Sequence, residues 1–280
     1  MTADGDINLD FLFSDFKNRQ EQLQKITRFD SYQIVFYRPD LLIHSKKVCW
    51  LVSELLPYAQ AAFGDSLDRN KAKIMALVHD DHEIIMGDFE FGHKQKLSAE
   101  QKIELNQRER LAIAKVAELF PEMIADYNYQ KLLSDFLDLK GAEAQLVKFA
   151  DKFDAFGEAL HEAFGGNHTL FENVDSEYGR LPNPFESYTK LFSDFASRYP
   201  SAEKLIKQNH PIFQPLEIID YKSIAEKSKP HSKDSIKFDA GYFPYDFWKT
   251  TILKYANEDE LSYLYKQKEF LPGNKDSDLS

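Results

Sequence analysis

The most informative part of the chain is LVHDDHEIIMGDF, residues 77–89. An apolar helix end runs into the doublet His79-Asp80, and Glu83 follows one helical turn after that histidine. A glycine, at which the backbone can turn sharply, precedes Asp88. A histidine and an aspartate that leave the same helix end can reach one ion, and the two later carboxylates can move protons beside it. This pattern predicts a transition-metal site in a helical protein.

Two distant residues extend the predicted site. His44 lies on the apolar face of a helix expected over residues 40–63, and Asp151 lies on the flank of the apolar face of another, residues 141–164. Taken singly, His44 reads as a satisfied core histidine and Asp151 as an exposed acid. A buried aspartate is costly unless it is paired or bound to a metal, so the whole set favours ligation. We predict one divalent metal (Mn, Fe, Co, Ni or Zn) held by His44, His79, Asp80 and Asp151.

Several of these residues also have simpler interpretations. The doublet alone is weak evidence, because His-Asp occurs by chance in roughly a quarter of chains of this length. Glu83 and Asp88 can also be read as solvated surface acids. His82 and His93 suggest a second metal, but we expect His93 in a loop and His82 pointing away from His79, which favours one ion. Of the other histidines, we expect a structural role for His161 and loop positions for His168, His210 and His231.

Composition and charge limit the possible functions. The 280 residues carry a formal net charge of −11, whereas a general nucleic-acid binder needs Lys and Arg for phosphate contacts. We therefore expect no nucleic-acid partner, and an anionic substrate would be held by a metal and local cations. We also expect no membrane span and no secretory leader, which predicts a cytoplasmic protein. The single cysteine, Cys49, reads as a packed core thiol.

The first part of the chain has the pattern of long helices. Asp40 can cap the helix that follows it, and Ser98 with Gln101 three residues later is a capping-box pattern. Residues 27–37 are the best candidate for an extended segment. Helices are predicted over residues 8–26, 40–63, 70–80, 81–86, 98–119, 129–139 and 141–164.

Gly165-Gly166-Asn167 separates this part from a second one that is richer in proline. We expect helices over 184–198, 201–208 and 243–268, an irregular segment over 211–240, and a disordered tail from about residue 270. The predicted organisation is a core over residues 1–165 and a mostly helical C-terminal extension, residues 166–280, packed on it.

The order His44, His79-Asp80, Asp151 resembles the HD-domain metal-dependent phosphohydrolases. Within that superfamily, four pieces resemble the bacterial 5′-deoxynucleotidase branch: His44-Ser45, His79-Asp80-x-x-Glu83, Gly87-Asp88 and Leu146-Val147-Lys148-Phe149-Ala150-Asp151. The resemblance covers roughly residues 20–165. It implies an all-α HD-domain helical bundle that forms a homodimer and hydrolyses deoxyribonucleoside 5′-monophosphates to deoxynucleoside and phosphate.

The resemblance also implies roles for single residues. Glu83 would be the acid/base residue, and Asp88 would orient the water or the sugar. Arg28, Phe29 and Lys94 would contact the substrate. The family has Trp after its Arg, and Phe29 stands there in this chain. Because those positions read the deoxyribose and the phosphate, the selectivity for deoxy over ribo substrates stays open.

The first prediction is therefore a metal-dependent phosphohydrolase acting on a (deoxy)nucleoside 5′-monophosphate through attack of metal-bound water. One alternative is an HD enzyme with another phosphate substrate, such as a nucleoside triphosphate, a cyclic nucleotide or a modified phosphomonoester. The other is a non-catalytic interaction protein on an HD scaffold, with the Tyr- and Phe-rich residues 243–268 as its contact surface.

Overall fold

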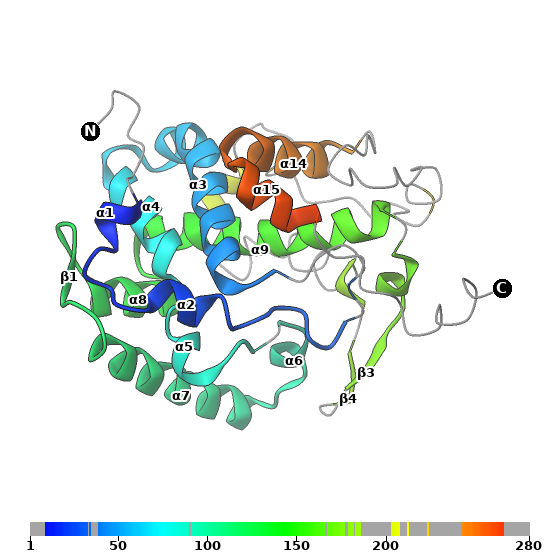
Figure 1. The fold of residues 1–280 in the computed structure, drawn as a ribbon, viewed down its shortest axis with the longest axis horizontal. Helices are drawn as coiled ribbons and strands as arrows, with labels where there is room; N and C mark the ends of the chain where they lie inside the picture. The colour runs from blue at the N-terminus through cyan, green and yellow to red at the C-terminus, as the bar shows by residue number, and fades with distance from the viewer. Residues whose placement is uncertain are drawn as a thin grey trace.

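The computed structural model describes residues 9–32, 34, 39–89, 91–165, 167–176, 179–181, 183–185, 203–207, 212, 223 and 242–265. Figure 1 shows a mostly helical protein, which confirms the predicted all-α class. The α-helices are α1 (Leu9–Leu12), α2 (Arg19–Leu23), α3 (Leu41–Phe63), α4 (Arg69–Val78), α5 (Glu83–Met86), α6 (Phe91–Lys96), α7 (Ala99–Ala117), α8 (Tyr129–Leu137), α9 (Gly141–Phe164), α12 (Glu203–Ile206), α14 (Phe243–Tyr255) and α15 (Glu258–Tyr265). Two 3-10 turns, η1 (Gly64–Ser66) and η2 (His168–Phe171), follow α3 and α9.

Helix α9 is the centre of the bundle and is buried on nearly every side. It runs across the middle of Figure 1, with α14 on one side and α8 on the other. Helices α3 and α4 pack against α9 and against each other. The predicted apolar stripe of α3 supplies much of this contact: Val48, Leu51, Val52 and Leu55 are 0% exposed. Each such side chain contributes about 1.5–3 kcal/mol through burial.

Local signals fix the ends of several helices as predicted. The Asp40 side chain accepts a hydrogen bond from the backbone N–H of Ile43 at 2.9 Å and starts α3. Ser98 and Gln101 form a full capping box at the start of α7. Gly87 ends α5 with φ of 78°, a conformation that disfavours other residues.

The N-terminal segment differs from the prediction. Instead of one helix over residues 8–26, the structure has the short helices α1 and α2 with turns between them. Asn18 takes a left-handed conformation (φ of 61°), which interrupts the helix. The break directs Arg19 into the core, where its guanidinium binds the carboxylate of Asp81. A long-range ion pair has thus overridden a local helical pattern.

The sequence analysis did not predict the short β-strands of the structure. Strands β1 (Met123–Ile124) and β2 (Tyr127–Asn128) form one antiparallel hairpin, and β3 (Val174–Ser176) and β4 (Gly179–Leu181) form another. In the segment predicted to be extended, residues 27–37, Thr27 forms an antiparallel bridge with Asp40. Residues 33 and 35–38 of that segment lie outside the described residues.

The C-terminal extension reaches the core through α14, which packs against both α3 and α9. The predicted helix 243–268 is two helices, α14 and α15, within the described part of the chain. Most of the predicted segments 184–198 and 211–240, and the tail from about residue 270, lie outside the described residues. The division at residue 165 stays a prediction.

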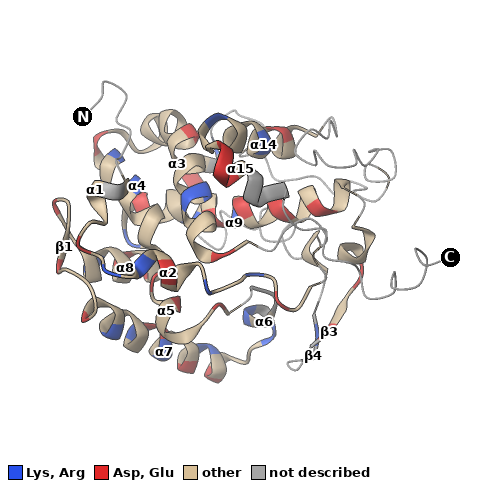
Figure 2. Cartoon of the chain, in the orientation of Figure 1, with Lys and Arg blue, Asp and Glu red and all other residues tan. Residues whose placement is uncertain are grey.

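Charged residues of both signs are distributed over the described helices. Acidic and basic residues alternate along α7 in Figure 2 and do not form a basic stripe on it. Among the described residues, no helix is long and apolar enough to cross a membrane.

Candidate metal centre

Two histidines from different helices present the same ring nitrogen to one point. His44 lies in the first turn of α3, and His79 caps the C-terminal end of α4. The Nδ1 atom of His44 lies 2.8 Å from Asp154 Oδ2, and Nδ1 of His79 lies 2.8 Å from the carbonyl oxygen of Ala76. Each ring therefore donates from Nδ1. Both Nε2 atoms are buried and make no hydrogen bond, so their lone pairs are left for another ligand.

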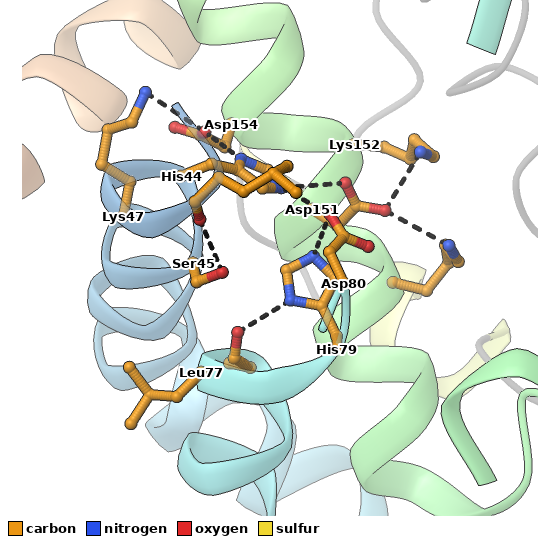
Figure 3. A network of polar contacts seen from close by, with 12 residues as sticks. His44, Ser45, Lys47, Leu77, His79, Asp80, Asp151, Lys152 and Asp154 are labelled. Carbon is orange, nitrogen blue, oxygen red and sulfur yellow. Dashed lines mark hydrogen bonds and ion pairs between the residues drawn. The ribbon is translucent and has the colours of Figure 1, made fainter. Parts of the chain in front are cut away.

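Two carboxylates lie beside these nitrogens, as Figure 3 shows. Asp80 Oδ2 is 3.1 Å from His79 Nε2 and 3.4 Å from His44 Nε2. Asp151 Oδ1, from α9, is 3.6 Å from His44 Nε2. His44, His79 and Asp151 each offer a ligand atom, and these three atoms lie within 4.8 Å of one another. The structure therefore brings together all four residues predicted as metal ligands.

The donor set fits a divalent transition metal. Two neutral imidazole nitrogens with two carboxylates suit Mn, Fe, Co, Ni or Zn, and the two buried Nε2 atoms have no other hydrogen-bond partner. Burial lowers the pKa of His44, but Asp151, Asp154 and Asp80 outweigh it and raise the pKa to about 10. The carboxylates around Nε2 therefore favour positive charge there, which a proton supplies without a metal and which a bound metal ion supplies in its place.

The two predicted carboxylate ligands are held in their charged form. Burial raises the pKa of Asp80, but His79 and His44 hold it well below its ordinary value. Burial likewise raises the pKa of Asp151, and Lys152 with Lys148 holds it well below the ordinary range. Metal ligation requires deprotonated carboxylates, so both are in the state that an ion needs.

A cavity of about 320 Å³ opens in front of this group. Every predicted site residue lines it except His44, which lies behind it and is 0% exposed. The predicted substrate and acid/base residues that line it are Arg28, Phe29, Glu83, Asp88 and Lys94. A cavity of this size falls at the lower end of the range for small-molecule sites.

Glu83 has the chemistry of a proton donor. Burial, then the charges of Asp80 and Asp88, raise its pKa well above the ordinary value. Its Oε2 atom is buried and has no hydrogen-bond partner. Glu83 is therefore a carboxyl group that keeps its proton to higher pH than a surface glutamate does.

Arg28 supplies two unused donors at the cavity. It is 9% exposed, and its Nε and Nη1 atoms are buried without a hydrogen-bond partner. Its guanidinium lies 5.4 Å from the centre of the Phe29 ring. Phe29 itself has φ of 59°, which is rare for a bulky residue and concentrates at functional sites.

Sequence reasoning missed several charged residues of the site. Lys148 and Lys152 line the cavity and lie 3.2 Å and 3.0 Å from Asp151 Oδ2. Because Lys148 lies three residues before Asp151 and Lys152 one residue after it, the sequence contained a signal that could have indicated them. Lys94, predicted from the resemblance, donates to Glu109 at 2.8 Å. Asp154, one turn after Asp151, was missed although it holds His44.

Four predictions about the other histidines can be compared with the structure. His93 is wrong as a loop residue, because it is buried in α6, with Nε2 3.5 Å from the Ser31 hydroxyl. His82 lines the same cavity as His79 but is not in the close ligand group. His161 is buried against the Tyr245 hydroxyl, 3.0 Å away, as a structural residue would be. His168 lies in η2, whereas His210 and His231 fall outside the described residues.

The chain is similar to known proteins in sequence and, more weakly, in fold. A family model described as 5′-deoxynucleotidase YfbR-like matches residues 15–197. A 5′-deoxynucleotidase of Shewanella oneidensis is 26% identical over 148 residues, which cover 52% of this chain and 74% of the relative. The 5′-deoxynucleotidase HDDC2 of Dictyostelium discoideum is 30% identical over 153 residues, 55% of this chain and 66% of the relative. A solved structure of a predicted metal-dependent phosphohydrolase from Magnetospirillum magnetotacticum aligns with a TM-score of 0.42 at 22% identity, covering 56% of this chain and 72% of that one.

Proposed function

The chain belongs to the YfbR-like 5′-deoxynucleotidase family of metal-dependent phosphohydrolases, and we propose that it hydrolyses deoxyribonucleoside 5′-monophosphates to deoxynucleoside and phosphate. The observation that carries the proposal is the convergence of two hydrogen-bond-free Nε2 atoms and two ionised carboxylates on one point. An acid with a raised pKa lines the cavity in front of them.

His44 and His79, through Nε2, would hold the metal together with Asp80 and Asp151. When bound, the metal supplies Lewis-acid chemistry, lowering the pKa of a water and neutralising charge on the phosphoryl group. The identity of the metal among Mn, Fe, Co, Ni and Zn is open, because a mixed nitrogen and oxygen donor set serves each of them.

Arg28 is the residue best placed to bind the phosphate. Its Nε and Nη1 donors have no hydrogen-bond partner, so the guanidinium can donate to phosphate oxygens. Lys148 and Lys152, which also line the cavity beside Asp151, add positive charge. These local cations would hold a dianionic substrate although the whole chain carries a net charge of −11.

Glu83 would give its proton to the leaving alkoxide of the sugar. A carboxyl group does so efficiently when its pKa lies near the working pH, and the direction of the Glu83 shift meets that need. Asp88, which lines the same cavity, would orient the water or the sugar. The aromatic rings of Phe29, Tyr32 and Phe136 supply an apolar wall against which a nucleoside can pack.

One observation favours the alternative of a substrate with more phosphates. Four cations line the cavity: Arg28, Lys94, Lys148 and Lys152. The three lysines pair with Glu109 or Asp151, and a longer phosphate chain could reach them as well as Arg28. A deoxynucleoside triphosphate, cleaved to nucleoside and triphosphate by the same groups, is therefore the second candidate.

Product analysis tests the proposal. Purified protein is incubated with deoxy- and ribonucleoside mono-, tri- and cyclic phosphates, with added Mn or Co and in parallel with EDTA. The proposal expects free phosphate from deoxynucleoside monophosphates, abolished by EDTA. Triphosphate released from deoxynucleoside triphosphates, with no turnover of monophosphates, would replace it by the alternative. That the protein is a cytoplasmic homodimer remains a prediction, which light scattering and localisation would test.

A further inference from the structure

A tryptophan from the C-terminal extension reaches the back of the metal centre. Trp248 of α14 is 1% exposed, and its indole Nε1 donates to Asp154 Oδ1 at 2.8 Å. Asp154 lies on α9, one turn after the predicted ligand Asp151. The contact spans 94 positions of sequence and connects a segment outside the predicted core with the interior of the bundle.

The second oxygen of Asp154 holds a predicted metal ligand. Asp154 Oδ2 accepts from Nδ1 of His44 at 2.8 Å, and Nζ of Lys47 lies 3.3 Å from the same oxygen. Figure 3 shows Asp154 between Lys47 and His44. Asp154 is therefore held at both oxygens, and a carboxylate held in this way cannot turn away from the imidazole. A carboxylate on the rear nitrogen fixes the tautomer and the orientation of a ligating histidine.

The α9 backbone makes room for the indole. A Cβ atom at Gly157 would come within 2.3 Å of the Trp248 ring, so only glycine allows the ring to lie in its present place. Glycine inside a helix is destabilising, and here it permits this approach. Nζ of Lys47 lies 5.6 Å from the centre of the same ring. The position of Trp248 is thus set by steric contact as well as by its hydrogen bond.

We propose that Trp248 is a positioning residue for the metal ligand His44, acting through Asp154, so that α14 of the C-terminal extension sets the affinity of the site for its metal. The proposal rests on the metal site of the proposed function but not on its substrate. It gives α14 a role at the metal site, whereas the sequence pattern of residues 243–268 indicated either ordinary core or a contact surface. Loss of the indole N–H would leave Asp154 Oδ1 buried without that donor and free the carboxylate to rotate away from His44.

The test is the metal affinity of the full-length protein, measured for Co and Mn by competition with a chelator. Trp248→Phe keeps an aromatic ring in the pocket beside Gly157 and removes the donor. Trp50→Phe is the matched control, because Trp50, the other of the two tryptophans, lies on α3 and stacks on Tyr255 at the end of α14. Asp154→Asn shows how strongly metal affinity depends on the Asp154 carboxylate itself.

We expect Trp248→Phe to weaken metal binding about tenfold and Asp154→Asn by about tenfold to 100-fold, the range for residues that support a ligand. Trp50→Phe should stay within about twofold of the unmodified protein, since it leaves the ligands and their supports in place. A Trp248→Phe affinity equal to that of Trp50→Phe would overturn the proposal, even if the melting temperature fell, because packing alone would then explain the residue.

A shape-matched variant covers the case in which Trp248→Phe does not fold. Benzothienylalanine in place of Trp248 keeps the bicyclic ring and lacks the N–H, and it should weaken metal binding to a similar extent. Unchanged affinity in that protein would overturn the proposal. An unmodified protein that bound no metal would overturn the proposed function as well, whereas metal binding without phosphate release would contradict only the substrate.

Discussion

Two neighbouring aspartates, Asp80 and Asp81, are expected to respond in opposite ways to the same substitution. Asp81 is 0% exposed and points away from the cavity. Its carboxylate accepts from Nε and Nη2 of Arg19 at 2.7 Å and 2.6 Å, and from the Tyr129 hydroxyl at 2.8 Å. Asp80 instead faces His44 and His79 and lines the cavity. We therefore assign folding to the first residue and metal binding to the second.

The expected loss of stability in Asp81→Asn follows from the burial of Arg19, the partner of Asp81. Arg19 is 4% exposed, so the substitution leaves a buried guanidinium without a counter-charge. Breaking a buried ion pair in this way costs about 3–5 kcal/mol of the free energy of unfolding. At about 2 °C per kcal/mol for a protein of this size, the melting temperature should fall by roughly 6–10 °C. The metal ligands are untouched, so metal affinity should change little.

Asp80→Asn should give the reverse pattern. It removes one of four ligands, so metal affinity should fall by more than the roughly 100-fold seen for residues that only support a ligand. Its effect on the free energy of unfolding should be smaller than that of Asp81→Asn, because no buried cation loses its only carboxylate partner.

Two assays separate the roles. Urea unfolding of EDTA-treated protein, followed by circular dichroism, measures folding, and chelator competition measures metal affinity. Arg19→Met should reproduce the instability of Asp81→Asn, and the double variant should lose less than the sum, since the two residues form one pair. The reasoning is refuted if Asp81→Asn unfolds at the same urea concentration as the unmodified protein, or if Asp80→Asn keeps its metal affinity.

Two further predictions concern the cavity. Glu83→Gln should lower kcat about 10²- to 10⁴-fold while metal affinity persists. Because the folded-state pKa of Glu83 is raised, the unmodified protein loses stability as pH rises through that pKa. In urea unfolding, the stability of the variant relative to the unmodified protein should therefore grow with pH, and a pH-independent difference would contradict the pKa shift. Arg28→Lys should raise KM for a monophosphate about tenfold, because an ammonium cannot replace the separate guanidinium donors. An unchanged KM with unchanged kcat would remove Arg28 from the substrate site.

Local sequence signals predicted the parts of this protein that depend on neighbours in the chain. The Asp40 and Ser98 caps, the stripe of α3 and the glycine that ends α5 are each readable within a few residues. His44 was placed on the apolar face of its helix, Asp151 on the flank of another, and His79-Asp80 at a helix end. These local placements lie close together in the structure, whereas metal binding by the four residues stays a prediction.

Long-range contacts decided what the sequence could not predict. The break at Asn18 turns Arg19 toward Asp81, which lies 62 positions away in the sequence. No local sequence pattern predicts that ion pair. Trp248 lies in an aromatic segment whose pattern is more typical of ordinary core, and its contact with Asp154 places it beside the candidate metal centre. His93 was predicted in a loop, whereas the chain forms a short helix there and the side chain is buried.

The central claim is that one divalent metal is held by His44, His79, Asp80 and Asp151. Anomalous diffraction at the metal edge, from crystals of protein reconstituted with Co or Mn, tests it most directly. The account predicts one anomalous peak, about 2.0–2.2 Å from Nε2 of both histidines and from an oxygen of each aspartate. A peak elsewhere, such as between His82 and His93, or two peaks in the cavity, would contradict it.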